Sequence, residues 1–126
     1  MIKGVGVDNV DISRLNKIYE KWGKKFTNKI FNTEEIPSYK DKKSFLNSLA
    51  GKFAAKEAIA KALGNGFRDG LTFKSIKIIK SASGKPVAFV NNNNNEIMIS
   101  ITHTDKIATA IALSLIHISE PTRPSV

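Results

Sequence analysis

The first third of this chain carries an apolar strand pattern followed by helical patterns. Residues 2–8 form an apolar run that contains two glycines and ends in Asp8, which predicts a buried strand with a close backbone neighbour. We expect the strand to end near Val10. Asp11 then caps a helix that stops at Gly23.

Two further helix signals follow along the chain. Residues 33–35 begin a short helix, which Pro37 limits because proline cannot continue it. Residues 42–63 form the longest helical pattern and consist mainly of strong helix formers. Gly64 is expected to cap this helix, and residues 65–66 form a turn.

Beyond residue 70 the pattern changes from helix to strand. Apolar runs separated by turn residues predict four strands, at 71–80, 87–90, 97–101 and 107–113, with a turn at 83–86 and an asparagine loop at 91–95. The sequence therefore predicts an α+β domain. An N-terminal strand and helices, including one long helix, precede an antiparallel sheet.

Two carboxylates stand where core packing would place apolar side chains. Asp8 closes the first apolar run, and Glu57 falls within the apolar stripe of the long helix. That stripe consists of Leu46, Leu49, Phe53, Ala60 and Leu63. Burying an unpaired charge is costly, so a cation, a metal or a proton must accompany these groups. Lys61, one turn beyond Glu57, is the simplest ion-pair partner.

Composition narrows the class of protein. The chain has 126 residues, of which 41% are hydrophobic, so we expect one domain that is small enough to depend on a partner subunit. It has no cysteine, which excludes disulfides and thiolate metal sites. It shows neither a signal peptide nor an apolar run of membrane-spanning length. We therefore expect a soluble, cytoplasmic protein that does not bind a membrane.

The net charge of +9 calls for an anionic partner, such as nucleic acid, a membrane surface, an acidic protein or a phosphorylated small molecule. Basic residues recur at helical spacing between residues 14 and 29, with Glu20 as the single acid among them. These are Arg14, Lys17, Lys21, Lys24, Lys25 and Lys29, opposite an apolar face of Ile12, Leu15, Ile18, Tyr19 and Trp22. A solvated face explains this stripe as well as a docking surface does.

A nucleic-acid-binding module is the alternative that the charge alone suggests. It is disfavoured because the chain has few aromatic residues and they are not interleaved with the basic stripe. No known nucleic-acid-binding signature is present either. We therefore expect no nucleic-acid partner.

Four blocks, in this order and spacing, resemble the bacterial holo-acyl-carrier-protein synthases. The blocks are residues 4–8 with Arg14, residues 45–46 and 51–58 with Lys61 and Gly64, residues 84–86, and residues 100–104. This family is the small, trimer-forming branch of the 4'-phosphopantetheinyl transferases, and the resemblance covers residues 1–114. It implies the phosphopantetheinyl transferase fold.

The resemblance implies an enzyme of fatty acid biosynthesis that moves 4'-phosphopantetheine from coenzyme A to a serine of apo acyl carrier protein. Asp8 and Glu57 are then ligands of Mg²⁺, and Lys61 stabilises charge on the phosphate. Glu57 and Lys61 are the implied catalytic residues. The serine proton leaves through Glu57 or through a metal-bound water, and the sequence does not separate these routes.

The resemblance also implies a coenzyme A groove that is completed between the subunits of a homotrimer. Its implied residues are Lys52, Gly64, Lys85 and Pro86, together with Thr102, His103 and Thr104 from the neighbouring subunit. Lys52 stands where the family usually has arginine, so it offers a point charge rather than a two-pronged contact. Acidic carrier protein is expected to dock on Arg14, Lys17, Lys21, Lys24, Lys25 and Phe26.

Some residues depart from the family pattern. Asn9 replaces an apolar residue, Pro37 interrupts a helix start, and the loop 91–95 has no counterpart. Residues 115–126 also lack one, and their sequence is typical of a translated sequencing-library adapter. We expect a transferase domain at 1–114 and a tail of artefactual origin at 115–126.

A catalytically silent trimeric scaffold of the same fold is a third reading of the chain. It is disfavoured because Asp8, Glu57 and Lys61 are all present.

Overall fold

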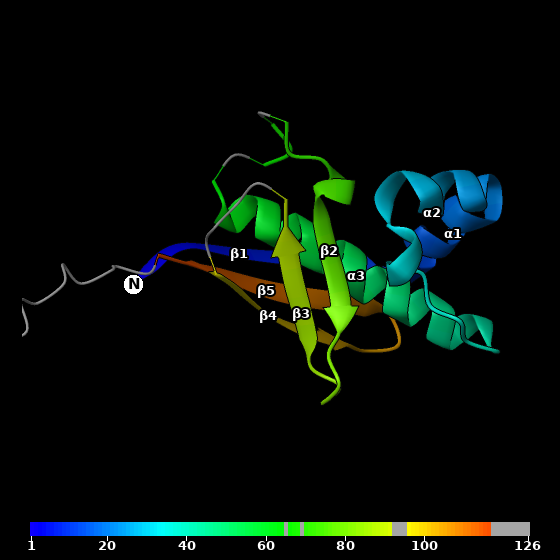
Figure 1. Ribbon diagram of the computed structural model, residues 1–126. Helices are drawn as coiled ribbons and strands as arrows, with labels where there is room; N and C mark the ends of the chain where they lie inside the picture. Colours follow the sequence, from blue (N-terminus) through cyan, green and yellow to red (C-terminus); the bar gives the residue numbers. More distant parts are fainter. Residues whose placement is uncertain (65, 69, 92–95, 117–126) are drawn as a thin grey trace, which may run out of the picture.

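The computed structural model describes residues 1–64, 66–68, 70–91 and 96–116 (Figure 1). The elements run in the order β1 (Ile2–Asp11), α1 (Ile12–Trp22), α2 (Lys24–Ile30), the 3-10 helix η1 (Thr33–Glu35), α3 (Lys42–Ala62), the 3-10 helix η2 (Phe73–Ser75), β2 (Ile76–Lys80), β3 (Pro86–Val90), β4 (Glu96–His103) and β5 (Ile107–Leu115). The predicted α+β class is confirmed. Among the described residues, no helix is both long and apolar enough to span a membrane.

The strands form two antiparallel sheets. One has three strands in the order β1-β5-β4, and the other is the β2-β3 hairpin. The first strand of the chain therefore joins the last two, with Val7 opposite Ile111 and Asp8 opposite Ala110. Strand periodicity assigns residues to faces but does not specify a distant partner, so the sequence did not predict this pairing.

Helix α3 lies against the inner face of the three-stranded sheet, and the hairpin passes in front of it in Figure 1. The glycines of β1 make this contact close. A Cβ atom on Gly6 would lie 1.8 Å from the carbonyl oxygen of Ala58, and one on Gly4 would lie 1.9 Å from that of Ala62. The expected close backbone neighbour of the first strand is thus confirmed, and it is α3.

Within the described part of the chain, the outer face of the same sheet is uncovered, contrary to the expectation of a buried first strand. Val5 is 54% exposed and Val7 is 49% exposed, while Ile111 on β5 and Met98 on β4 are 41% and 45% exposed. The apolar run in β1 predicted a strand that is buried on both of its faces. Only its glycine face is covered by α3, so the valine face is bare.

The long helix is more enclosed than a single apolar stripe predicts. Leu46, Leu49 and Ala60 are buried as expected, and so are positions outside the stripe such as Ala55 and Ile59. The reason is that α3 packs against the sheet on one side and the hairpin on the other. The helix ends at Ala62, and Gly64 follows with φ of 88°, a conformation that favours glycine.

The basic stripe lies on two helices rather than one. The Asp11 carboxylate accepts a hydrogen bond from the Arg14 amide at 3.1 Å, which confirms the predicted cap of α1. Gly23, with φ of 55°, ends α1, and a second helix that the sequence did not predict begins at Lys24. Ile18 and Trp22 were expected to pack inward, but they are 37% and 52% exposed.

The last strand extends slightly past the end of the family resemblance. Leu115 pairs with Ile2 and Glu96, and the amide of Ile116 donates to the Met1 carbonyl oxygen at 2.9 Å. The first residue of the expected tail, Leu115, therefore belongs to the sheet, and Ile116 is hydrogen-bonded beside it. Residues 117–126, the loop 92–95 and the turn residue Asn65, which the sequence predictions also covered, lie outside the described residues.

Candidate active site

The contact between β1 and α3 brings Asp8 and Glu57 to one cavity. Asp8 lies on the same face of β1 as Gly4 and Gly6, two and four residues earlier, so it faces α3. The cavity holds about 460 Å³ and is also lined by Arg14 of α1. The two carboxylates singled out in the sequence thus share a site.

Lys61 joins this site through Asp8. Its ammonium donates to Oδ1 of Asp8 at 3.0 Å and to the carbonyl oxygen of Val7 at 3.0 Å. The simple i+4 partnership with Glu57 is therefore not the ion pair that the structure forms. The Asp8 side chain is 13% exposed and that of Lys61 is 54% exposed, so the pair lies at the mouth of the site.

The pKa of the Glu57 carboxyl is raised well above its ordinary value. Burial is the main cause that raises its pKa to about 7, and the negative charge of Asp8 raises it further, while Lys61 opposes the shift. Two carboxylates in one cavity repel each other, and a bound cation removes that cost.

The donor set fits a hard cation that keeps several waters. In the described part of the chain, nowhere do three or more histidine, aspartate or glutamate side chains gather closely enough to hold a metal ion. Mg²⁺, however, commonly takes only one or two protein carboxylates and completes its shell with water and substrate phosphate. Asp8 and Glu57 are the residues that would hold it.

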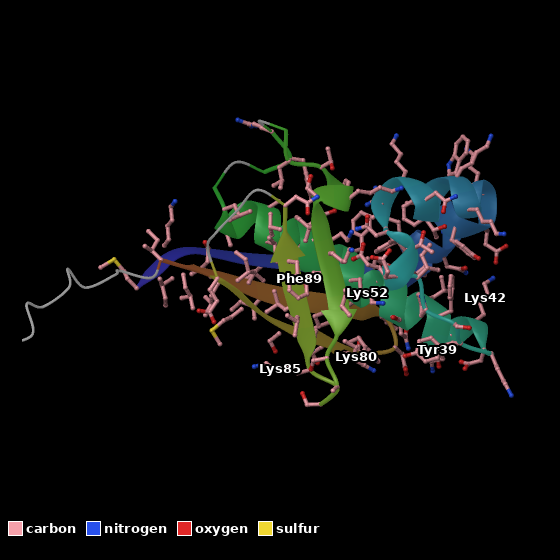
Figure 2. The ribbon with its side chains drawn as sticks, viewed as in Figure 1. Tyr39, Lys42, Lys52, Lys80, Lys85 and Phe89 are labelled. Carbon is pink, nitrogen blue, oxygen red and sulfur yellow. The ribbon has the colours of Figure 1, made fainter. Side chains whose placement is uncertain are left out.

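A second cavity, also of about 460 Å³, lies between α3, the β2-β3 hairpin and the end of β4. Lys52, Pro86 and His103, three residues of the expected coenzyme groove, line it together with Tyr39 and Lys80. Lys52 and His103 were expected to meet across two subunits, but they line one cavity of the same chain. Figure 2 shows Lys80 and Lys85 at the end of the hairpin, on the side where Tyr39 lies. Lys85 is exposed beside Pro86.

Three expected coenzyme residues lie elsewhere. Gly64 follows the end of α3 and is exposed. Thr102 pairs with Thr109 on the outer face of the sheet. The hydroxyl of Thr104 accepts from the amides of Lys106 and Ile107, both at 3.2 Å, so it shapes the turn between β4 and β5.

The two cavities share no lining residue. Helix α3 contributes Lys52 to one and the next residue, Phe53, to the other, because successive residues of a helix point to different sides. One chain therefore holds two separate cavities, one lined by carboxylates and one by basic side chains.

The expected docking residues lie near each other on α1 and α2. Arg14, Lys17, Lys21, Lys24 and Lys25 are all exposed. Phe26 is half-buried, with its ring 6.2 Å from that of Phe53. Its other side lines a hollow with Ile18, Trp22, Lys25 and Lys29.

Sequence reasoning missed several residues that these surfaces use. Tyr39 lies in a segment without periodicity and gave no signal, and Lys80 looked like the polar end of a strand. Trp22 was assigned to the packed face. Its exposure beside the hollow gave no signal in the sequence, because the apolar spacing of α1 does not show which of its apolar residues reach the core.

Comparison with known proteins decides the family. A model of the 4'-phosphopantetheinyl transferase superfamily matches residues 4–114. The chain is also 36% identical over 122 residues to the holo-[acyl-carrier-protein] synthase of Halothermothrix orenii, covering 90% of this chain and 97% of that protein. The chain belongs to the holo-[acyl-carrier-protein] synthase family.

Solved structures of holo-[acyl-carrier-protein] synthases agree in fold. The enzyme from Neisseria meningitidis gives a TM-score of 0.82 at 30% identity, covering 92% of this chain and all of the other. The enzyme from Bacillus anthracis, solved in complex with CoA (3',5'-ADP), gives 0.81 at 29% identity, covering 90% and 96%. The family resemblance read from the sequence is confirmed.

The shared site predicts a pH effect. The pKa of Glu57 lies above its ordinary value of 4.5, so folding favours its protonated form. The contribution of protonated Glu57 to the free energy of unfolding is present below pH 4.5 and is lost as the pH rises through about 7.

Asp8→Asn should lower the pKa of Glu57, as followed by carboxyl carbon NMR. Glu34→Gln, an exposed change, is the control and should leave it in place. An unchanged Glu57 titration in Asp8→Asn would show that the two carboxylates do not interact.

Proposed function

We propose that this chain transfers the 4'-phosphopantetheine group from coenzyme A to a serine hydroxyl of apo acyl carrier protein, with Mg²⁺ bound at Asp8 and Glu57. The observation that carries the proposal is that Asp8 and Glu57 line one cavity and that the Lys61 ammonium bonds to Asp8 beside it. The name of the relative from Halothermothrix orenii and the coenzyme complex from Bacillus anthracis support the substrate pair. The expected context is fatty acid biosynthesis.

The chemistry is a displacement at the phosphorus of coenzyme A that carries the phosphopantetheine arm. The serine oxygen forms a bond to this phosphorus, and the bond to adenosine 3',5'-bisphosphate breaks. Such transfers need positioning and charge neutralisation more than covalent help. Lys61 stands beside Asp8, where its ammonium can stabilise charge on the phosphate oxygens. Glu57, or a water in its cavity, takes the serine proton.

The second cavity supports a proposal for the adenosine 3'-phosphate end of coenzyme A. Lys52, Lys80 and His103 give it donors that can contact a phosphate, and Tyr39 adds an aromatic wall. Burial lowers the pKa of Lys52, and the carboxylate of Glu35 opposes this. On the family resemblance, we assign Pro86 to this cavity with Lys85 beside it, and Gly64 to another part of the coenzyme groove.

The uncovered sheet face supports a homotrimer. Val5, Val7, Met98 and Ile111 expose apolar surface side by side across three strands. Contiguous apolar surface of this kind usually marks an interface. A neighbouring copy seated there would bring its Lys52 and His103 half-site towards the Asp8 half-site of the first copy, which would complete one active site from two chains.

The basic helices support the docking of an acidic carrier protein. Lys24 and Lys25 stand at the start of α2, beside the hollow that Trp22 and Phe26 line. Charges around an apolar hollow suit a partner that presents acidic residues around an apolar contact. The surface adjoins Arg14, which lines the acidic half-site, so a docked carrier would stand near the chemistry.

The catalytic assignment predicts distinct losses for three variants. Asp8→Ala and Glu57→Ala should each lower transfer at least about 100-fold, because each removes a metal ligand and its charge neutralisation. Lys61→Ala should keep metal binding and lower kcat by a similar factor, since the loss falls on the transition state. Mass spectrometry of carrier protein after incubation with coenzyme A and Mg²⁺ measures the gain of phosphopantetheine.

Lys43→Ala, an exposed change on the same helix, is the matched control and should transfer normally. Near-normal rates for Asp8→Ala and Glu57→Ala would refute the metal assignment. A wild-type protein that leaves the carrier mass unchanged would favour the silent scaffold.

The docking proposal predicts a selective loss. Lys24→Glu with Lys25→Glu should raise the KM for carrier protein about tenfold or more and leave the KM for coenzyme A nearly unchanged, because opposite charges are replaced by like ones. The wild-type rate should also fall as salt is added. Equal losses for both substrates would place carrier docking on another surface. Lys3→Glu at the far end of β1 controls for net charge.

A further inference from the structure

Lys56 and Glu35 are fully buried charged residues that the proposed chemistry does not use. Both side chains are 0% exposed, and the ammonium of Lys56 lies 2.7 Å from Oε1 of Glu35. Lys56 is the residue before Glu57 on α3, and Lys52 lies one turn earlier. Charged residues of this kind are rarely buried unless a specific arrangement needs them.

The ammonium of Lys56 uses all three of its hydrogens. It donates to Glu35, to the carbonyl oxygen of Ile30 at 2.9 Å and to that of Phe73 at 2.8 Å. The ring of Phe31 lies 5.3 Å away and adds a cation-π contact. Lys56 therefore joins the end of α2 and the 3-10 helix η2 to α3.

The carboxylate of Glu35 binds from the other side. Its Oε1 accepts from the backbone amide of Asn32 at 2.8 Å and from the side-chain amide at 2.9 Å. Its Oε2 accepts from the amide of Ile78 on β2 at 2.8 Å, and its backbone oxygen accepts from the ammonium of Lys52. Glu35 therefore joins η1 and the hairpin to α3.

The segments that this pair joins carry the working surfaces of the protein. Helix α2, which ends at Ile30, holds the proposed docking residues Lys24 and Lys25. Strand β2 leads to Lys80 and the coenzyme cavity, where Lys52 also lies. Helix α3 carries Glu57. The ion pair is bonded to all three of these elements, α2, β2 and α3.

Stability alone does not require a charged pair at this place. Desolvating both groups is expensive, and replacing such a pair with apolar residues of similar volume is often neutral or stabilising. Burial lowers the pKa of Lys56, and the Glu35 carboxylate opposes this. A hydrogen-bonded pair supplies direction, which an apolar contact does not. Its bonds fix the backbone at Ile30, Asn32, Phe73 and Ile78 at set distances and angles.

We propose that Lys56 and Glu35 are positioning residues. Their buried ion pair holds the carrier-docking helix α2 and the coenzyme-binding Lys52 at fixed positions relative to Glu57. The proposal rests on the proposed transferase function. It assigns no contact with substrate to either side chain. Small displacements of reacting groups are costly in rate, and this pair is the element that prevents them.

The test removes both charges together. Lys56→Met with Glu35→Gln leaves no lone buried charge, and the glutamine oxygen can still accept from the backbone amide of Ile78. The double variant should remain folded by circular dichroism. At a temperature well below its unfolding transition, its kcat/KM should fall at least about tenfold for both carrier protein and coenzyme A. Its Mn²⁺ affinity, followed by electron paramagnetic resonance, should stay at the wild-type value, because the pair forms no hydrogen bond with β1.

The matched control lies on the same segments. Lys77 and Glu34 form an exposed ion pair between β2 and η1, one residue away from Ile78 and Glu35. Lys77→Met with Glu34→Gln should transfer at the wild-type rate. A folded Lys56→Met, Glu35→Gln variant with wild-type kinetics would overturn the positioning role while leaving the transferase function intact. Loss of Mn²⁺ binding in that variant would also overturn it, since the damage would then reach the acidic half-site.

If the double variant does not fold, Asn32→Ala takes its place. This change removes one of the bonds that hold Glu35 and leaves both charges paired. It should lower kcat/KM several-fold for both substrates with little change in the unfolding temperature. Unchanged kinetics in Asn32→Ala would then overturn the proposal. A wild-type protein without transfer activity would instead refute the proposed function.

Discussion

The structure depends on how closely β1 approaches α3. Side chains at Gly4 and Gly6 would collide with the carbonyl oxygens of Ala62 and Ala58, so only glycine permits the contact. Because side chains alternate along a strand, this contact turns Asp8 towards the helix and places it in the cavity that Glu57 lines. The same alternation sends Val5 and Val7 to the opposite face, where no described residue of the chain covers them. One packing constraint thus determines both the acidic half-site and the bare sheet face.

The two half-sites have complementary chemistry. The acidic one gathers two carboxylates, and it suits a cation and a phosphate, since burial and then the charge of Asp8 raise the pKa of Glu57 to about 7. The basic one gathers Lys52, Lys80 and His103, and it suits a second phosphate. A substrate with a pyrophosphate and a separate 3'-phosphate, as in coenzyme A, needs both. The buried pair of Lys56 and Glu35 joins α2, η2 and β2 to α3.

Much of this could be predicted from the sequence because it depends on local chemistry. The cap at Asp11, the glycines of the first strand and the misplaced carboxylates are each visible in a few residues. The partnership of β1 with β5 spans about 100 residues, and no local pattern encodes it. Lys56 was missed for a related reason. On a helix that is enclosed on several sides, its position looks exposed until the partner Glu35, 21 residues earlier, is placed beside it.

Subunit complementation tests most directly whether the two half-sites work together across an interface. Asp8→Ala removes the acidic half-site, and Lys52→Ala with His103→Ala removes the basic one. Each variant should be nearly inactive alone. In trimers refolded from an equal mixture, about a quarter of the interfaces pair two intact half-sites, so about a quarter of the wild-type activity should return. A mixture as inactive as its components would contradict the account, because it would show that each chain completes its own site.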